Sequence, residues 1–179
     1  GIHNGIIVNV DDLWSELSFI KREYEIDTEV LLALVNYYLK KTNSIKNAIS
    51  KSINKIYGTV ASGLLLTKYN KFVLATNNGS LYTIQKEGNI IIFASERYIL
   101  QKLINKMSLN KLIDECKIKE IKPMTGLVCD IDKLTISNFS LSENYIDEKI
   151  KLETDSPKIN KYNINPNEEQ TSVVMDLNF

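Results

Sequence analysis

Residues 58–94 read GTVASGLLLTKYNKFVLATNNGSLYTIQKEGNIIIFA, and they decide the fold because their hydrophobic pattern is strand-like, whereas the pattern before them is helical. Turn-forming residues divide this stretch at Tyr69-Asn70, Asn77-Asn78-Gly79 and Glu87-Gly88. The predicted strands are 59–67, 71–76, 80–85 and 89–94. Strands joined by such short turns predict a run of antiparallel hairpins.

Upstream of these strands, apolar residues recur at helical spacing. The predicted helices are 11–22, 27–41 and 44–58, and Gly58 suits the end of the third. Asp27 could serve as the N-cap of the second helix. The first ten residues are strand-like, with a polar turn expected at His3-Asn4-Gly5 because Asn-Gly is a common hairpin signal.

Downstream, Ser95-Glu96 precedes a helical pattern that carries Tyr98, Leu103 and Ile104. Strands are expected at 118–121 and 126–131, with a further candidate at 134–137. From about Leu141 the chain becomes polar and irregular, which is typical of a linker or a surface tail. The sequence therefore predicts one α/β domain over residues 1–140 and a polar tail or linker over residues 141–179.

Composition argues against several classes of protein. Lysine plus arginine and aspartate plus glutamate both number 22, so no basic face is implied for nucleic acid or an anionic membrane. The apolar runs are shorter than the ~20 residues of a membrane span. Cys116 and Cys129 lack partners for a metal site, so we expect free thiols, no metal, no cofactor and a cytoplasmic location.

Three segments, in this order, resemble one known family. They are His3-Asn4-Gly5-Ile6-Ile7, Asp27-Thr28-Glu29-Val30 and Gly58-Thr59, the last leading through the strand array to Phe93-Ala94-Ser95-Glu96. The combination resembles the class II glutamine amidotransferase domain, the amino-terminal-nucleophile type, and most of all that of the glutamine:fructose-6-phosphate amidotransferases. The resemblance runs from residue 2 to about residue 137 and matches the carboxy-terminal two-thirds of the family domain.

The resemblance implies a fold of two stacked antiparallel β-sheets flanked by helices, four layers in all. Such stacking would cover both faces of a strand, which explains the nearly continuous apolar runs at 61–66 and 90–94. If the absent third of the domain supplies central strands, this chain exposes sheet edges and apolar faces. We therefore expect a covering partner: the missing amino-terminal segment, a second chain or a homo-oligomer.

The resemblance also assigns residues to the hydrolysis of glutamine. The Asn4 side-chain amide and the Gly5 backbone N–H would form an oxyanion hole, and Asp27 would bind the α-amino group of glutamine. His3 is expected to be positional rather than catalytic. The family's nucleophile is a cysteine at the mature amino terminus, whereas position 1 here is Gly, so we expect this chain to be inactive alone.

The implied function is the glutaminase portion of a glutamine-dependent amidotransferase. Ammonia from glutamine would pass to a synthase domain, and the resemblance implies that this domain aminates a sugar phosphate. Two alternatives stay open: a non-catalytic member of the fold that binds glutamine or a protein partner, and an amidotransferase branch that acts in purine or asparagine synthesis.

Overall fold

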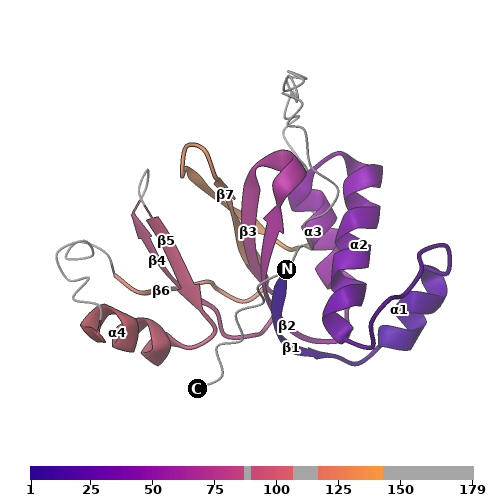
Figure 1. The fold of residues 1–179 in the computed structure, drawn as a ribbon, viewed down its shortest axis with the longest axis horizontal. Helices are drawn as coiled ribbons and strands as arrows, with labels where there is room; N and C mark the ends of the chain where they lie inside the picture. The colour runs from indigo at the N-terminus through magenta and orange to yellow at the C-terminus, as the bar shows by residue number, and fades with distance from the viewer. Residues whose placement is uncertain (87–89, 107–116, 143–179) are drawn as a thin grey trace, which may run out of the picture.

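The computed structural model describes residues 1–86, 90–106 and 117–142. These residues fold into four layers (Figure 1). Helices α1 to α3 cover one face of a five-stranded sheet, and a three-stranded sheet stacks on its other face. Helix α4 covers the outer face of the smaller sheet. The turn at Glu87-Gly88, Cys116 and nearly all of the expected tail lie outside the described residues.

The larger sheet is antiparallel throughout and has the strand order β1-β2-β3-β7-β8. Its strands are β1 (Ile2–Ile7), β2 (Gly58–Leu66), β3 (Lys71–Thr76), β7 (Thr125–Asp130) and β8 (Ile136–Ser140). The first strand of the chain is therefore an edge strand. One side of its backbone pairs with β2. No strand of the described residues pairs with the other side, which we call the free edge.

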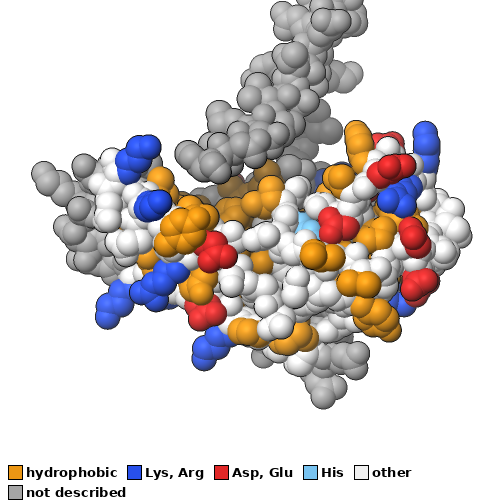
Figure 2. Space-filling view, turned by 90° about the horizontal axis from the view of Figure 1, so that it is seen from below, with side chains coloured by type: hydrophobic (Ala, Val, Ile, Leu, Met, Phe, Trp, Pro, Cys, Tyr) orange, Lys and Arg blue, Asp and Glu red, His pale blue; other side chains and the backbone are white. Residues whose placement is uncertain are grey.

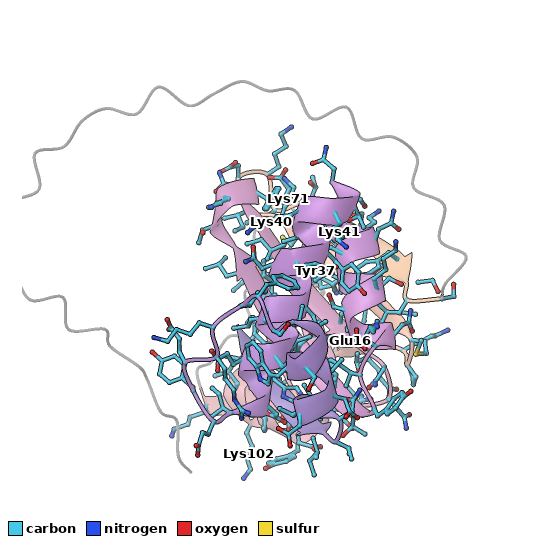
Figure 3. The ribbon with its side chains drawn as sticks, turned by 90° about the vertical axis from the view of Figure 1, so that its right-hand side faces the viewer. Glu16, Tyr37, Lys40, Lys41, Lys71 and Lys102 are labelled. Atoms are coloured by element: carbon cyan, nitrogen blue, oxygen red, sulfur yellow. The ribbon has the colours of Figure 1, made fainter. Side chains whose placement is uncertain are left out.

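The helical layer consists of α1 (Val10–Glu16), α2 (Asp27–Thr42) and α3 (Ile45–Asn54). Its apolar residues share one buried cluster with side chains of the larger sheet, including Val60, Leu64 and Val73. Figure 3 shows this layer from outside, with Tyr37, Lys40 and Lys41 labelled on α2. Lys41 Nζ lies 4.3 Å from the centre of the Tyr37 ring, so the ammonium group covers an aromatic face.

The smaller sheet has the order β5-β4-β6, with β4 (Tyr82–Lys86), β5 (Ile90–Ala94) and β6 (Lys119–Glu120). Ile91 and Phe93 of β5 pack in the cluster between the sheets, whereas Ile92 packs toward α4 (Arg97–Lys106). Both faces of β5 are thus covered, as its continuous apolar run predicted. The same holds for β2, where Val60 faces the helices and Ala61 faces the smaller sheet.

The turn expected at His3-Asn4-Gly5 is wrong. β1 runs straight through these residues, and each pairs in register with β2, with Asn4 opposite Ala61 and Gly5 opposite Val60. Asn-Gly favours a hairpin only when a partner strand follows directly. Here the next element is α1, and the partner strand arrives after three helices.

Three helix and strand boundaries also differ from the prediction. Helix α1 ends at Glu16 rather than near Arg22, because Ile20 N–H bonds to the Leu17 carbonyl in a tight turn. Helix α3 ends at Asn54, so Gly58 does not cap it and instead begins β2. The strand expected at 134–137 is β8, Ile136–Ser140.

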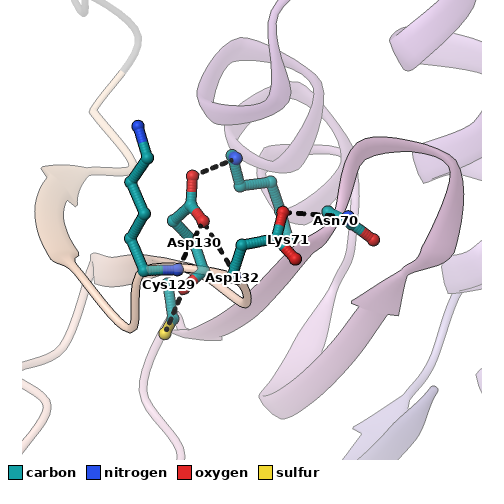
Figure 4. A network of polar contacts seen from close by, with 6 residues as sticks. Asn70, Lys71, Cys129, Asp130 and Asp132 are labelled. Carbon is teal, nitrogen blue, oxygen red and sulfur yellow. Dashed lines mark hydrogen bonds and ion pairs between the residues drawn. The ribbon is translucent and has the colours of Figure 1, made fainter. Parts of the chain in front are cut away.

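The shift of β8 follows from a polar network at the β7–β8 turn (Figure 4). Asp130 Oδ1 accepts the backbone N–H groups of Asp132 and Lys133, which folds residues 131–135 into a turn with Leu134 at a positive φ. Lys71 Nζ lies 2.7 Å from Asp130 Oδ2 and joins β3 to the turn. This lysine holds the pKa of Asp130 below its ordinary value.

Candidate functional site

Gly5 and Gly58 allow the close pairing of β1 with β2. Gly5 has φ +148, and a Cβ there would lie 2.0 Å from the carbonyl oxygen of Thr59. Gly58 has φ +131, and a Cβ there would lie 1.9 Å from the carbonyl oxygen of Ile6. Only glycine fits either position, so the close approach of the two strands from Gly5 to Gly58 requires that neither residue carries a side chain.

The backbone of β1 presents polar groups at the free edge. Val8 N–H bonds to the Tyr57 carbonyl, which places the even-numbered backbone groups toward β2. In an antiparallel ladder, alternate residues direct their N–H groups to the partner and away from it. The N–H groups of Gly5 and Ile7 therefore face the free edge, where they can bind groups from outside the sheet.

Asp27 lies at this edge because it is the first residue of α2. It is not the N-cap, since Ile26 occupies that position without a side-chain bond. The Asp27 Oδ2 atom instead accepts the Ile7 N–H at 3.2 Å. The capping role considered from the sequence is therefore wrong, and the carboxylate binds the β1 edge instead.

His3 contacts the same carboxylate. Its Nδ1 lies 3.6 Å from Asp27 Oδ1, and its Nε2 lies 3.3 Å from the carbonyl oxygen of Thr59. No sequence pattern predicts this contact, because His3 lies in β1 and Asp27 in α2, and no spacing rule relates a strand to the second helix after it. The only hint was the presence of both residues in the motifs that carry the resemblance.

Asn4 lies on the other face of β1. Side chains alternate along a strand, and the buried Ile7 shares the face of His3, whereas the exposed Ile2 and Ile6 share the face of Asn4. The structure thus brings His3, Gly5 and Asp27 together on the helix side of the edge. The Asn4 side chain projects from the opposite face of the strand.

Exposed apolar side chains surround this edge. We call the set the β1 rim; its members are Ile2, Ile6, Val8, Tyr24, Ile26 and Tyr57, each more than half exposed. Figure 2 shows hydrophobic side chains spread over this face, with a small pale-blue surface of the histidine beside an acidic side chain. Exposed apolar side chains beside an unpaired strand edge are typical of a surface that can pair with another polypeptide.

Two cavities of the described chain lie elsewhere. One, of about 580 Å³, opens between the two sheets and is lined from β4, β6, β7 and β8. The other, of about 220 Å³, lies among Gly1, α2 and the end of β2. Neither of these two cavities is lined by Asn4, Gly5 or Asp27.

Cys129 is a free, buried thiol, as the sequence predicted. Burial raises the pKa of this thiol, which keeps it protonated and weakly nucleophilic at neutral pH. Within residues 1–86, 90–106 and 117–142, no three His, Cys, Asp or Glu side chains gather to hold a metal ion. The helices of these ranges include none long and apolar enough to cross a membrane.

Comparison with known proteins agrees with the resemblance seen in the motifs. A family model described as a glutamine amidotransferase domain matches residues 1–102, more than half of the 179 residues. The chain is 26% identical over 132 residues to the glutamine–fructose-6-phosphate aminotransferase of Staphylococcus epidermidis. It is 27% identical over 135 residues to the enzyme of that name from Staphylococcus aureus.

Both alignments cover 73% of this chain but only 22% of the relative. Among solved structures, the glutamine phosphoribosylpyrophosphate amidotransferase of B. subtilis matches with a TM-score of 0.57 and 21% identity, over 80% of this chain and 29% of that one. A structure described as the allosteric regulatory enzyme of purine biosynthesis matches with a TM-score of 0.54 and 21% identity, over 79% of this chain and 28% of that one. These likenesses confirm the predicted fold class of two stacked antiparallel sheets flanked by helices.

Proposed function

The chain belongs to the glutamine amidotransferase domain family, and from this premise we propose that it is the glutaminase portion of a glutamine-dependent amidotransferase. The observation that carries the proposal is the free edge of β1, where Asp27 binds the Ile7 N–H and the Gly5 N–H, two residues along the strand, faces the same edge. A carboxylate there can bind the α-ammonium group of glutamine. The outward N–H of Gly5 and the amide of Asn4 can then stabilise an oxyanion from the two sides of the edge.

The reaction needs a cysteine thiolate that attacks the side-chain amide carbon of glutamine. The carbonyl π electrons move to oxygen, and the anion receives hydrogen bonds from Asn4 and Gly5. Collapse of this intermediate expels ammonia with a proton from a general acid, and water then hydrolyses the thioester to glutamate. In the proposal, residues 1–140 are the later part of the domain, and the cysteine belongs to polypeptide that precedes them.

Only the names of the relatives support the proposed acceptor. The sequence relatives are glutamine–fructose-6-phosphate aminotransferases, so we propose a synthase domain that aminates a sugar phosphate, with residues 141–179 leading toward it. The purine branch stays the second choice for the acceptor, since one solved structure that shares the fold is named for purine biosynthesis and the other for phosphoribosyl pyrophosphate. Comparing amination of fructose 6-phosphate and of phosphoribosyl pyrophosphate by the complete gene product decides between them.

The test of glutamine hydrolysis uses the complete gene product and measures ammonia and glutamate. We expect Asn4→Ala to lower kcat by roughly two orders of magnitude and Asp27→Asn to raise the KM for glutamine roughly tenfold or more. The exposed Asn78 and Asp12 offer matched controls, Asn78→Ala and Asp12→Asn, which should leave both constants unchanged. Absence of ammonia release by the unmodified protein would overturn the proposal.

A non-catalytic member of the fold is the second candidate. It is favoured by one observation: the described thiol, Cys129, is buried in β7 and far in the sheet order from β1. A protein of this kind would bind glutamine, or a partner on the β1 rim, without hydrolysis. Calorimetric binding of glutamine with no release of ammonia would support this candidate over the first.

A further inference from the structure

His3 is the only histidine of the chain, and its side chain is buried although it lies on an edge strand. The imidazole is 1% exposed, because α2 covers the face of β1 from which it projects. One ring nitrogen faces the Asp27 carboxylate, and the other faces the Thr59 carbonyl oxygen. The ring thus joins the backbone of β2 to the first residue of α2.

The two oxygens of Asp27 are held from different directions. Oδ2 accepts the Ile7 N–H at 3.2 Å, whereas Oδ1 faces His3 Nδ1 at 3.6 Å and the Thr28 hydroxyl at 3.5 Å. A carboxylate held at one oxygen can still turn about its Cβ–Cγ bond. The Ile7 N–H holds one oxygen, the longer contacts of His3 and Thr28 restrict the turning of the other, and a third of the side chain stays exposed.

We propose that His3 is a positioning residue that fixes the Asp27 carboxylate in the orientation that receives the α-ammonium group of glutamine. The inference rests on the proposed function, because it says how the same site selects a free amino acid. His3 does not act on the reacting amide. A general base needs a nitrogen within reach of the reacting group, and both nitrogens of this buried ring face oxygens of the protein.

Three substitutions separate the two contacts of the ring. His3→Asn places an amide N–H near the position of Nδ1, toward Asp27, and His3→Gln places one near the position of Nε2, toward Thr59. His3→Leu keeps neither. In the complete gene product, we expect the KM for glutamine to rise roughly tenfold in the Leu and Gln variants and about twofold in the Asn variant, with kcat nearly constant.

A pair of inhibitors reports on the amino group directly. L-Glutamate carries the α-ammonium group and glutarate lacks it, so the ratio of their inhibition or calorimetric binding constants measures what Asp27 contributes. We expect His3→Leu to reduce this preference for glutamate roughly tenfold and His3→Asn to retain it. A residue that merely packs would weaken both ligands equally and would not be rescued by Asn, and either result overturns the proposal.

The outcomes distinguish this inference from the proposed function. If Asp27→Asn abolishes the preference for glutamate and His3→Leu leaves it intact, the role of His3 is wrong and the function stands. If the unmodified protein neither hydrolyses glutamine nor prefers glutamate to glutarate, both are wrong. Because Asn and Gln are polar and similar in size to His, thermal unfolding of these two variants checks that the fold is retained.

Discussion

At the scale of single residues, two glycines decide whether the candidate site exists. Gly5 and Gly58 lie diagonally across the β1–β2 pairing, and each receives a carbonyl oxygen of the other strand where a Cβ would stand. The sequence pattern does not predict that Gly5 and Gly58 lie close together, because it places Gly58 at the end of a helix rather than at the start of a strand. The edge of β1 where His3 lies and where Asp27 of α2 binds depends on this close approach of the two strands.

We expect Gly5→Ala to lower the free energy of unfolding by about 2–4 kcal/mol, because the new methyl group meets the Thr59 carbonyl and φ +148 is strained for alanine. Urea unfolding of the two proteins measures the difference. The neighbouring Asn4→Ala is the control, since Asn4 is exposed and should change stability by less than ~0.5 kcal/mol. Equal stability of Gly5→Ala and the unmodified chain would contradict the geometry at Thr59.

The ion pair of Lys71 with Asp130 predicts a pH dependence of stability. Because the pKa of Asp130 is lowered in the folded state, its contribution is fully present above the unfolded pKa of ~4 and is lost as pH falls through the folded pKa. We expect Asp130→Asn to be less stable by about 1 kcal/mol at pH 7, with the difference shrinking below pH ~4. Denaturant unfolding at several pH values, with Asp12→Asn as control, measures this; a constant difference would refute it.

At the scale of elements, the residue at the start of a helix can either cap that helix or bind a neighbouring strand. Ser44 caps α3 through its hydroxyl, which accepts the Asn47 N–H at 3.3 Å. α2 has no such cap, and the carboxylate at its first residue binds the β1 backbone instead. A helix start that gives up its cap in this way ties its first turn to the neighbouring strand.

We expect Ser44→Ala to lower the free energy of unfolding by about 1 kcal/mol, the usual effect of removing an N-cap. Thermal or urea unfolding followed by circular dichroism measures this loss. Ser18→Ala, at an exposed position outside the helices, is the matched control and should have no effect. If the two variants unfold alike, the Ser44 hydroxyl contributes nothing to α3.

At the scale of the whole molecule, the β1 rim sets how the chain behaves alone. An edge strand with exposed Ile2, Ile6 and Val8 offers both hydrogen-bonding groups and apolar surface to another polypeptide. We propose that preceding polypeptide, a second chain or an oligomer covers this surface. The cover would also close the open edge at Asn4, Gly5 and Asp27 into a pocket.

We therefore expect residues 1–142 expressed alone to associate or to unfold at low denaturant concentration, because the apolar surface at β1 is uncovered. Sedimentation velocity and urea unfolding measure these two properties. Replacing Ile6 and Val8 together by Thr keeps β propensity while reducing the apolar surface, and should reduce association. A highly stable, cooperatively unfolding monomer would contradict this expectation.

The sequence by itself determined most of the elements and the family. The spacing of apolar residues distinguished the three helices from the strands after Gly58, since that spacing reflects which face of each element is buried. Apolar runs in β2 and β5 correctly indicated burial on both faces. The motifs around Asn4 and Asp27 indicated the glutamine amidotransferase family, which the family model confirms.

Only the tertiary structure decided what these motif residues contact. Pairing of β1 with β2 across three helices replaced the expected turn with an edge strand, and it brought the start of α2 against that edge. Contacts of this kind join residues far apart in the chain, so no local pattern encodes them. The packing of α2 on the sheet places Asp27 beside the β1 edge. Its carboxylate therefore contacts the Ile7 N–H and the His3 ring.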